Sequence, residues 1–215
     1  MDDKKLNDAI SELKKSEKKG FKQTVDFIAN LKGLDLKKPE HQVETFIQLP
    51  KFKGKKSKVC ALVGPEMSEQ AKNMDSFVLQ QDFEKYQADK KLIKKLAAGI
   101  DFFVAQATIM PKVASAFGRV LGPKGKMPNP KAGCIVPPNA NLGVLKERLQ
   151  NTVKVSGKKA PLIQVMVGNE DSSPEDLIEN IKYVYENLLH VLPQGENNVK
   201  TVYIKYTMGK AIKVM

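Results

Sequence analysis

Neither end of the chain carries enough predicted elements to make a domain alone, and this feature constrains the fold more than any other. The first block supplies a helix over 3–17, with apolar residues at helical spacing, and half-buried strands over 21–31 and 43–49, where apolar and polar residues alternate. The last block begins near Val153 and supplies a strand, a helix and a final strand. Joined, the two blocks predict two helices on one face of an antiparallel sheet, a split βαβ sandwich.

The helix of the last block has a clear start in the sequence. Ser173 is a hydroxyl N-cap, and Pro174 suits the first helical position because its ring already has a helical φ. Glu175 and Asp176 then place negative charge at the N-terminus, where the helix dipole favours it. We therefore expect a helix to begin directly after Ser173.

The middle of the chain alternates short apolar strands with helices, a pattern that favours βαβ units and a parallel sheet. Strands and helices are predicted in turn at 59–63, 67–74, 77–79, 83–98, 102–105, 107–121 and 142–151. The sequence therefore predicts an α/β fold in two domains. An α+β outer domain is formed by 1–57 and 156–215, and a Rossmann-like parallel-sheet domain, 58–155, is inserted into it.

The charge of the chain is strongly basic and unevenly spread. Among 215 residues, 36 are Lys or Arg and 24 are Asp or Glu, which gives a formal net charge of +12. Nearly all of the excess is lysine, no acidic residue occurs in 102–146, and acidic residues gather in 170–186. Lysine is a compact charge suited to phosphate, so the composition predicts contact with a nucleic-acid backbone. The alternative is a protein with a solvated, lysine-rich surface.

The sequence shows no candidate catalytic centre. His41 and His190 lack partners at metal-ligand spacing, Cys60 and Cys134 form no CxxC, and no serine lies in a GxSxG motif. We therefore predict a protein that is not an enzyme and that uses no cofactor or metal. The charged opening MDDKK and the lack of a long apolar run predict a soluble, intracellular chain with no membrane contact.

One glycine-rich segment stands out, GRVLGPKGKMPNPKAG at 118–133. Its spacing matches neither a Walker loop nor a Rossmann GxGxxG, so no nucleotide site is predicted there. It holds four glycines, three prolines and four cationic residues, namely Arg119, Lys124, Lys126 and Lys131. Because prolines fix φ and glycines permit tight turns, we predict a rigid basic loop that binds a polyanion. The alternative is a structural connection with solvated lysines.

The final predicted strand, 199–207, has one polar and one apolar face. The polar face offers hydroxyl and ammonium groups from Thr201, Tyr203, Lys205 and Thr207. Such groups suit the sugar and phosphate oxygens of RNA. The strand ends at Met208-Gly209, where the absent side chain lets a nucleotide come close.

These segments resemble a known family. The loop at 118–133 and YIKYTMGK at 203–210 are similar to the ribosomal stalk proteins called L-one, and FKQTVDFIANLKGLDLKKPE at 21–40 resembles their archaeal branch. The agreement runs over nearly all of the chain, in the same order. The resemblance implies the split two-domain architecture and binding of large-subunit ribosomal RNA, chiefly through the outer domain.

The resemblance also implies which residues contact RNA. The positions that match the family's RNA surface are Phe21, Thr24, Thr201, Thr207, Met208 and Gly209. We expect further salt-sensitive attraction from Lys154, Lys158, Lys159 and Lys205. Where many bacterial relatives have acids, this chain has Lys22 and Gln23, so contacts of those acids cannot be carried over. Lys126 replaces a leucine common in bacteria and is expected to make the loop more basic.

Two further partners follow from the resemblance. The stalk assists release of deacylated tRNA, which the basic loop would contact transiently, and family members repress translation by binding their own messenger RNA. We expect a protein of cytoplasmic ribosomes that is a monomer off the ribosome. The alternative function is a nucleotide-dependent enzyme that uses the inserted domain. It would need an acid at a strand end, and 102–146 supplies none.

Overall fold

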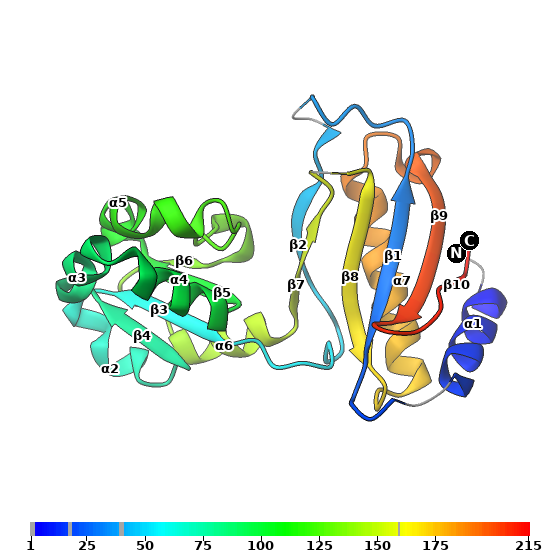
Figure 1. Cartoon of the computed structure of the whole chain (residues 1–215), viewed down its shortest axis with the longest axis horizontal. Coiled ribbons are helices and arrows are strands. Elements are labelled where there is room, and N and C mark those ends of the chain that lie inside the picture. The colour runs from blue at the N-terminus through cyan, green and yellow to red at the C-terminus, as the bar shows by residue number, and fades with distance from the viewer. Residues whose placement is uncertain (1–2, 17–18, 39–40, 159) are drawn as a thin grey trace. The chain divides into compact units, whose positions relative to one another are not determined.

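Two separate apolar cores divide the chain into two units (Figure 1). The computed structural model describes residues 3–16, 19–38, 41–158 and 160–215. The first unit comprises Met1–Lys56 and Asn151–Met215, and the second comprises Ser57–Gln150. Both ends of the chain therefore belong to one unit, and the other unit is an insertion.

The first unit is built on an antiparallel sheet with the strand order β10-β9-β1-β8. The bounds of these strands are β1 Thr24–Leu31, β8 Leu162–Asn169, β9 Val199–Tyr206 and β10 Ile212–Lys213. The N-terminal strand β1 lies between β8 and β9 and pairs antiparallel with both. Buried and half-buried residues alternate along β1, so the sheet has one apolar and one polar face.

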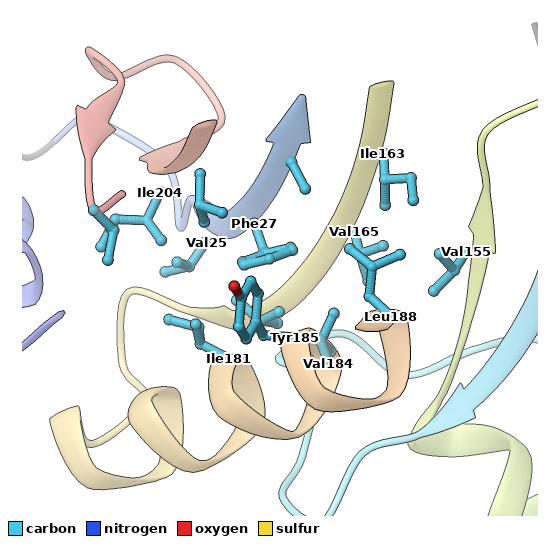
Figure 2. Packing of buried hydrophobic residues seen from close by; sticks show 14 of the residues in the cluster. Val25, Phe27, Val155, Ile163, Val165, Ile181, Val184, Tyr185, Leu188 and Ile204 are labelled. Atoms are coloured by element: carbon cyan, nitrogen blue, oxygen red, sulfur yellow. The ribbon is translucent and has the colours of Figure 1, made fainter. Parts of the chain in front are cut away.

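Two helices bury the apolar face of this sheet. Helix α7, Pro174–Val191, packs across it, and α1, Asp3–Lys15, packs against α7 and β9. Figure 2 shows Phe27 of β1 facing Tyr185 of α7 in this core. The start of α7 is as predicted, because the Ser173 hydroxyl oxygen accepts a hydrogen bond from the Asp176 N–H at 3.1 Å. The predicted α/β fold class, with helices on an antiparallel sheet, is confirmed.

A two-stranded ribbon completes the first unit. Strand β2, Glu44–Gln48, pairs antiparallel with β7, Thr152–Ser156, apart from the main sheet. Val155 of β7 joins the core of the first unit. The second junction therefore lies before Asn151, one strand earlier than the boundary after residue 155 that the sequence suggested, because the ladder partner of β7 is β2.

The second unit contains a parallel sheet with the strand order β4-β3-β5-β6. Its strands are β3 Val59–Val63, β4 Ser76–Leu79, β5 Phe102–Gln106 and β6 Ile135–Val136. Its helices are α2 Ser68–Ala71, α3 Phe83–Ala88, α4 Lys90–Gly99, α5 Met110–Leu121 and α6 Leu142–Gln150. Every residue of β3 is buried, as expected for an inner strand of a parallel sheet.

The helix predicted over 83–98 is two helices in the structure. Asp89 has extended backbone angles, and its side chain accepts a hydrogen bond from the Lys91 N–H at 2.7 Å. Asp89 therefore ends α3 and caps the N-terminus of α4. The break was hidden in the sequence because apolar residues keep their helical spacing on both sides of it.

Candidate nucleic-acid interface

The ends of β1 and β9 bring two predicted site residues, Thr24 and Thr207, into contact. Because the two strands run antiparallel, the start of one lies beside the end of the other. The two hydroxyl oxygens are 2.7 Å apart, and the Thr207 N–H donates to the Thr24 carbonyl at 3.1 Å. The Thr207 hydroxyl also lies 3.3 Å from that carbonyl oxygen. The result is a hydroxyl pair that remains accessible, because Thr207 is exposed.

Met208 and Gly209 form a tight turn directly after this pair. The Gly209 N–H donates to the Tyr206 carbonyl at 2.9 Å. A Cβ at Gly209 would lie 3.2 Å from the Tyr206 Cβ, which is a tight contact. Two apolar side chains stand open to solvent here, with Phe21 55% and Met208 67% exposed. We call Phe21, Thr24, Thr207, Met208 and Gly209 the threonine end of the sheet.

A buried glutamine holds the threonine end in place, a role that was not predicted from the sequence. Gln23 is 2% exposed, and its Oε1 accepts a hydrogen bond from the Met208 N–H at 3.1 Å. The Gln23 carbonyl accepts from the Glu170 N–H at 3.0 Å. The sequence did contain a signal for the burial of Gln23. Alternate residues of a strand face the same side, so Gln23 points inward together with Val25 and Phe27.

Thr201 lies at the other end of the sheet, away from the threonine end. Its hydroxyl accepts a hydrogen bond from Asn30 Nδ2 at 2.8 Å. Asn30 pairs with Leu162 at the start of β8, whereas Thr24 pairs with Asn169 at its end. Thr201 and Thr207 are six residues apart along the chain, an extended span of roughly 20 Å. The predicted site residues of β9 therefore follow the length of the strand.

Lys205 lies between these ends on the polar face and pairs with Asp26 of β1. Burial raises the pKa of the Asp26 carboxyl, while a hydrogen bond from the Thr24 hydroxyl and the charge of Lys205 act in the opposite direction. Asp26 thus places a partly desolvated acid beside the lysine. The polar face is consequently mixed in charge next to the threonine end.

Lys154 and Lys158 both form ion pairs with Glu44 and do not contribute to the threonine end. Their ammonium nitrogens lie 3.0 Å and 2.5 Å from the Glu44 carboxylate. The hydrogen bond from Lys158, with a further contribution from Lys154, lowers the pKa of Glu44 in spite of partial burial. The Lys154 ammonium also lies 5.8 Å from the centre of the Phe46 ring. Lys159 lies outside the described residues.

A hollow of about 630 Å³ opens beside the turn at Met208, between that turn and the C-terminal part of α1. Gln23 and Met208 line it on the side of the threonine end. Basic side chains also line it, from Lys15, Lys19 and Lys210. The threonine end therefore borders a concave surface lined by three lysines and one acid, Glu12.

The basic loop at 118–133 belongs to the second unit. Gly125 and Gly133 have φ values of +64° and +69°, which are left-handed angles that favour glycine. The Asn129 side chain accepts a hydrogen bond from the Lys131 N–H at 2.9 Å. Among the cationic side chains, Arg119, Lys124 and Lys131 are exposed.

Lys126 differs from the other cations of this loop. Its ammonium donates to the carbonyl oxygens of Ala97 and Ile100, at 2.9 Å and 2.5 Å, at the C-terminus of α4. The position is favourable because unpaired carbonyls and the negative end of the helix dipole meet a cation there. The Lys126 ammonium is therefore directed to the helix end, and its predicted contact with a polyanion stays a prediction.

A glutamine occupies the edge of the parallel sheet where ligands of such folds bind, outside the carboxyl ends of the strands. Gln106 ends β5 and is 2% exposed. Its Oε1 accepts from the Gly64 N–H at 3.0 Å, and its Nε2 donates to Glu66 at 3.3 Å. Glu66 is an acid close to the end of β3 that was not predicted from the sequence, and it accepts a hydrogen bond from Gln106.

Within residues 3–16, 19–38, 41–158 and 160–215, no group of three or more His, Cys, Asp or Glu side chains could hold a metal ion. In the same ranges, no helix is both long and apolar enough to span a bilayer.

Comparison with known proteins places these features in a family. A sequence model described as the ribosomal protein L1p/L10e family matches residues 13–210. The chain is 43% identical to large ribosomal subunit protein uL1 of Nanoarchaeum equitans, over 97% of this chain and 98% of that protein. The protein of the same name from Methanobrevibacter smithii is 41% identical over 97% of each chain. That of Methanocaldococcus jannaschii is 37% identical over 100% and 96%.

Proposed function

The chain belongs to the ribosomal protein L1p/L10e family and is a protein of the large ribosomal subunit, and we propose that it binds large-subunit ribosomal RNA through its threonine end. The observation that carries the proposal is the exposed hydroxyl pair of Thr24 and Thr207, 2.7 Å apart, with two exposed apolar residues, Phe21 and Met208, close to it in the chain. The relatives that the chain matches are named as ribosomal proteins and not as enzymes.

The chemistry of the threonine end suits RNA. The Thr24 hydroxyl donates to Asp26 and the Thr207 hydroxyl can donate to the Thr24 hydroxyl, so the pair offers free lone pairs as acceptors. A ribose 2′-hydroxyl can donate to such a pair. Phe21 and Met208 offer apolar contact to a base or a ribose next to it. Because Gln23 fixes the Met208 backbone, little ordering is needed on binding.

Lysines around this end provide the part of the affinity that depends on salt. Lys205 lies on the polar face of the sheet, and Lys15 and Lys210 line the adjoining hollow. Each lysine that neutralises a phosphate releases counterions, so binding weakens as salt rises. Specific contact by the hydroxyls and ionic contact by the lysines are therefore separable by mutation.

The test compares Thr207→Val with Lys205→Gln in gel shifts with large-subunit ribosomal RNA. Removing the Thr207 hydroxyl leaves an RNA group unpaired, a cost of about 1–3 kcal/mol or roughly 5- to 150-fold in affinity. Lys205→Gln should instead lower the salt slope by about one unit. Thr108→Val changes an exposed threonine of the second unit and is the control. Equal affinities of Thr207→Val and the unmodified chain would remove this residue from the site.

We also propose that the basic loop contacts tRNA transiently and assists release of deacylated tRNA. The support is the exposure of Arg119, Lys124 and Lys131 on a loop shaped by left-handed glycines. Replacing Lys124 and Lys131 with glutamine should slow tRNA release on reconstituted ribosomes, and more so at low salt. Thermal melting should be unchanged. Normal tRNA release by this variant would exclude the role.

A second RNA partner is the messenger RNA of this protein. We propose that the threonine end binds a similar structure there and represses translation, since the same hydroxyl pair would read the same fold in either RNA. Added protein should reduce translation of that messenger in vitro, and Thr207→Val should relieve the reduction. Repression that Thr207→Val leaves intact would separate it from this site. We expect the unbound protein to be a monomer in light scattering.

A further inference from the structure

The loop after β2 has its apolar and charged side chains in inverted positions. Phe52 is 45% exposed, whereas the next residue, Lys53, is 4% exposed, and its ammonium donates to the Thr152 carbonyl at 2.9 Å. Phenylalanine side chains are usually buried in the core, whereas lysine side chains are usually exposed to water. The fold therefore holds an aromatic ring at the surface of the first unit.

The backbone on both sides of Phe52 is anchored. Asn180 of α7 is buried, its Oδ1 accepts from the Lys51 N–H at 3.0 Å, and its Nδ2 lies 3.5 Å from the Lys51 carbonyl. Gly54 has a φ of +94°, and a Cβ there would lie 2.7 Å from the Gly168 carbonyl carbon. The ring is thus presented by a loop whose backbone is fixed, which lowers the entropy lost on binding.

The same loop is joined to the threonine end through one residue. Asn169 Nδ2 donates to the Gly54 carbonyl at 3.2 Å, and Asn169 pairs with Thr24 across β8 and β1. Gly54 and Thr24 therefore lie on either side of Asn169, within the first unit. Phe21, three residues before Thr24, and Phe52, two residues before Gly54, are both exposed.

We propose that Phe52 is a stacking platform for an unpaired base of RNA that is bound at the threonine end. The proposal rests on the proposed function of that end and adds a second contact to it. Exposed aromatic rings beside lysines are the usual means of holding unpaired bases, because every base has a π-face. The pair Phe21 and Phe52 would then contact nucleotides on either side of the hydroxyl pair.

The charges around Phe52 favour RNA over an apolar partner. Lys55 and Lys56 follow it and are exposed. Lys51 lies 3.8 Å from Asp176 and 3.5 Å from Glu179, so its charge is largely compensated. Two exposed lysines that follow the ring within four residues suit a phosphate backbone whose base stacks on that ring.

The first test uses fluorescence, because the chain contains no tryptophan. Phe52→Trp introduces a single indole, whose emission should be quenched as large-subunit ribosomal RNA is added. The quenching should saturate at the RNA concentration that saturates a gel shift. Phe77→Trp is the matched control, since Phe77 is 41% exposed and lies in the second unit. Unchanged emission of Phe52→Trp at full RNA binding would overturn the proposal.

The second test measures affinity in the full chain. Phe52→Leu keeps an apolar side chain but removes the ring, and it should weaken RNA binding about 5- to 10-fold, whereas Phe52→Tyr should restore it. Phe77→Leu should leave binding unchanged. If Thr207→Val weakens binding and Phe52→Leu does not, the threonine end stands and the stacking platform is wrong. If the unmodified chain does not bind this RNA, the proposed function fails first.

Discussion

The antiparallel sheet of the first unit and the parallel sheet of the second offer different places for a ligand. Burial alternates along β1, so one face of its sheet carries polar side chains that solvent can reach. All five residues of β3 are buried, and Gln106 fills the edge beyond it. Antiparallel sheets can leave a face open, whereas parallel sheets are enclosed. In the second unit, therefore, the loops are the surface on which a polyanion can bind.

The two units also differ in what their basic residues do. In the first unit, Lys154 and Lys158 share Glu44. In the second, Lys126 faces the carbonyls at the end of α4, while Lys124 is exposed. Net charge therefore overstates the number of cations that can meet a nucleic acid. Each lysine has to be judged by its neighbours.

The largest effect should come from separating the units. Residues 1–56 joined to 151–215 by a short glycine linker should keep ribosomal RNA binding within about tenfold, because the first unit has its own core. The isolated second unit, 57–150, should bind at least about a thousandfold more weakly, a loss of roughly 4 kcal/mol. Circular dichroism would first show that each unit folds, and gel shifts would then compare their RNA binding. If the first unit folds but does not bind RNA, the RNA site lies in the second unit.

Matched core mutations sharpen the same comparison in the full chain. Phe27 and Phe117 are fully buried, one in each core. Either change to alanine should cost about 3–5 kcal/mol of unfolding free energy in its own unit. Phe27→Ala should also weaken RNA binding, and Phe117→Ala should not. Denaturant titrations monitored by circular dichroism would measure the unfolding free energies. Gel shifts at denaturant concentrations below the unfolding transition would measure RNA binding. Equal losses of binding would mean that the units do not act separately.

A smaller effect is expected within the basic loop. Lys126→Met removes two hydrogen bonds to helix carbonyls and should destabilise the second unit by about 1–2 kcal/mol. Lys124→Met, at an exposed site, should change stability by less than about 0.5 kcal/mol. Thermal melting of the two variants makes the comparison. Equal melting temperatures would show that the Lys126 contacts contribute little.

The smallest effect concerns Glu44 and depends on pH. Its pKa is lower in the folded chain, chiefly through the hydrogen bond from Lys158, so its contribution is present above the unfolded pKa near 4.5 and is lost as pH falls through the folded value. Glu44→Gln should therefore cost a few tenths of a kcal/mol at pH 7 and nothing at low pH. Urea titrations at both pH values, with exposed Glu147→Gln as control, would measure it. A cost that is the same at both pH values would argue against the ion pairs.

Local pattern determined much of this protein. Alternation of apolar residues gave β1, and an apolar run gave the bounds of β3, Val59–Val63. Ser173 and Pro174 marked the start of α7. These features depend on neighbours in sequence, so they can be read without a structure. β6 and β10 have two residues each, too few to show a period, and both were missed.

Contacts between distant segments were decided by tertiary structure alone. Strand register places Thr207 against Thr24 and leaves Thr201 at the far end of the sheet, although both threonines share one face of β9. The same holds for charge, because Lys126 meets helix carbonyls far from it in sequence. Residue type and periodicity give the face on which a side chain lies. Which group it meets there depends on how strands pair and helices end, and no local pattern encodes that.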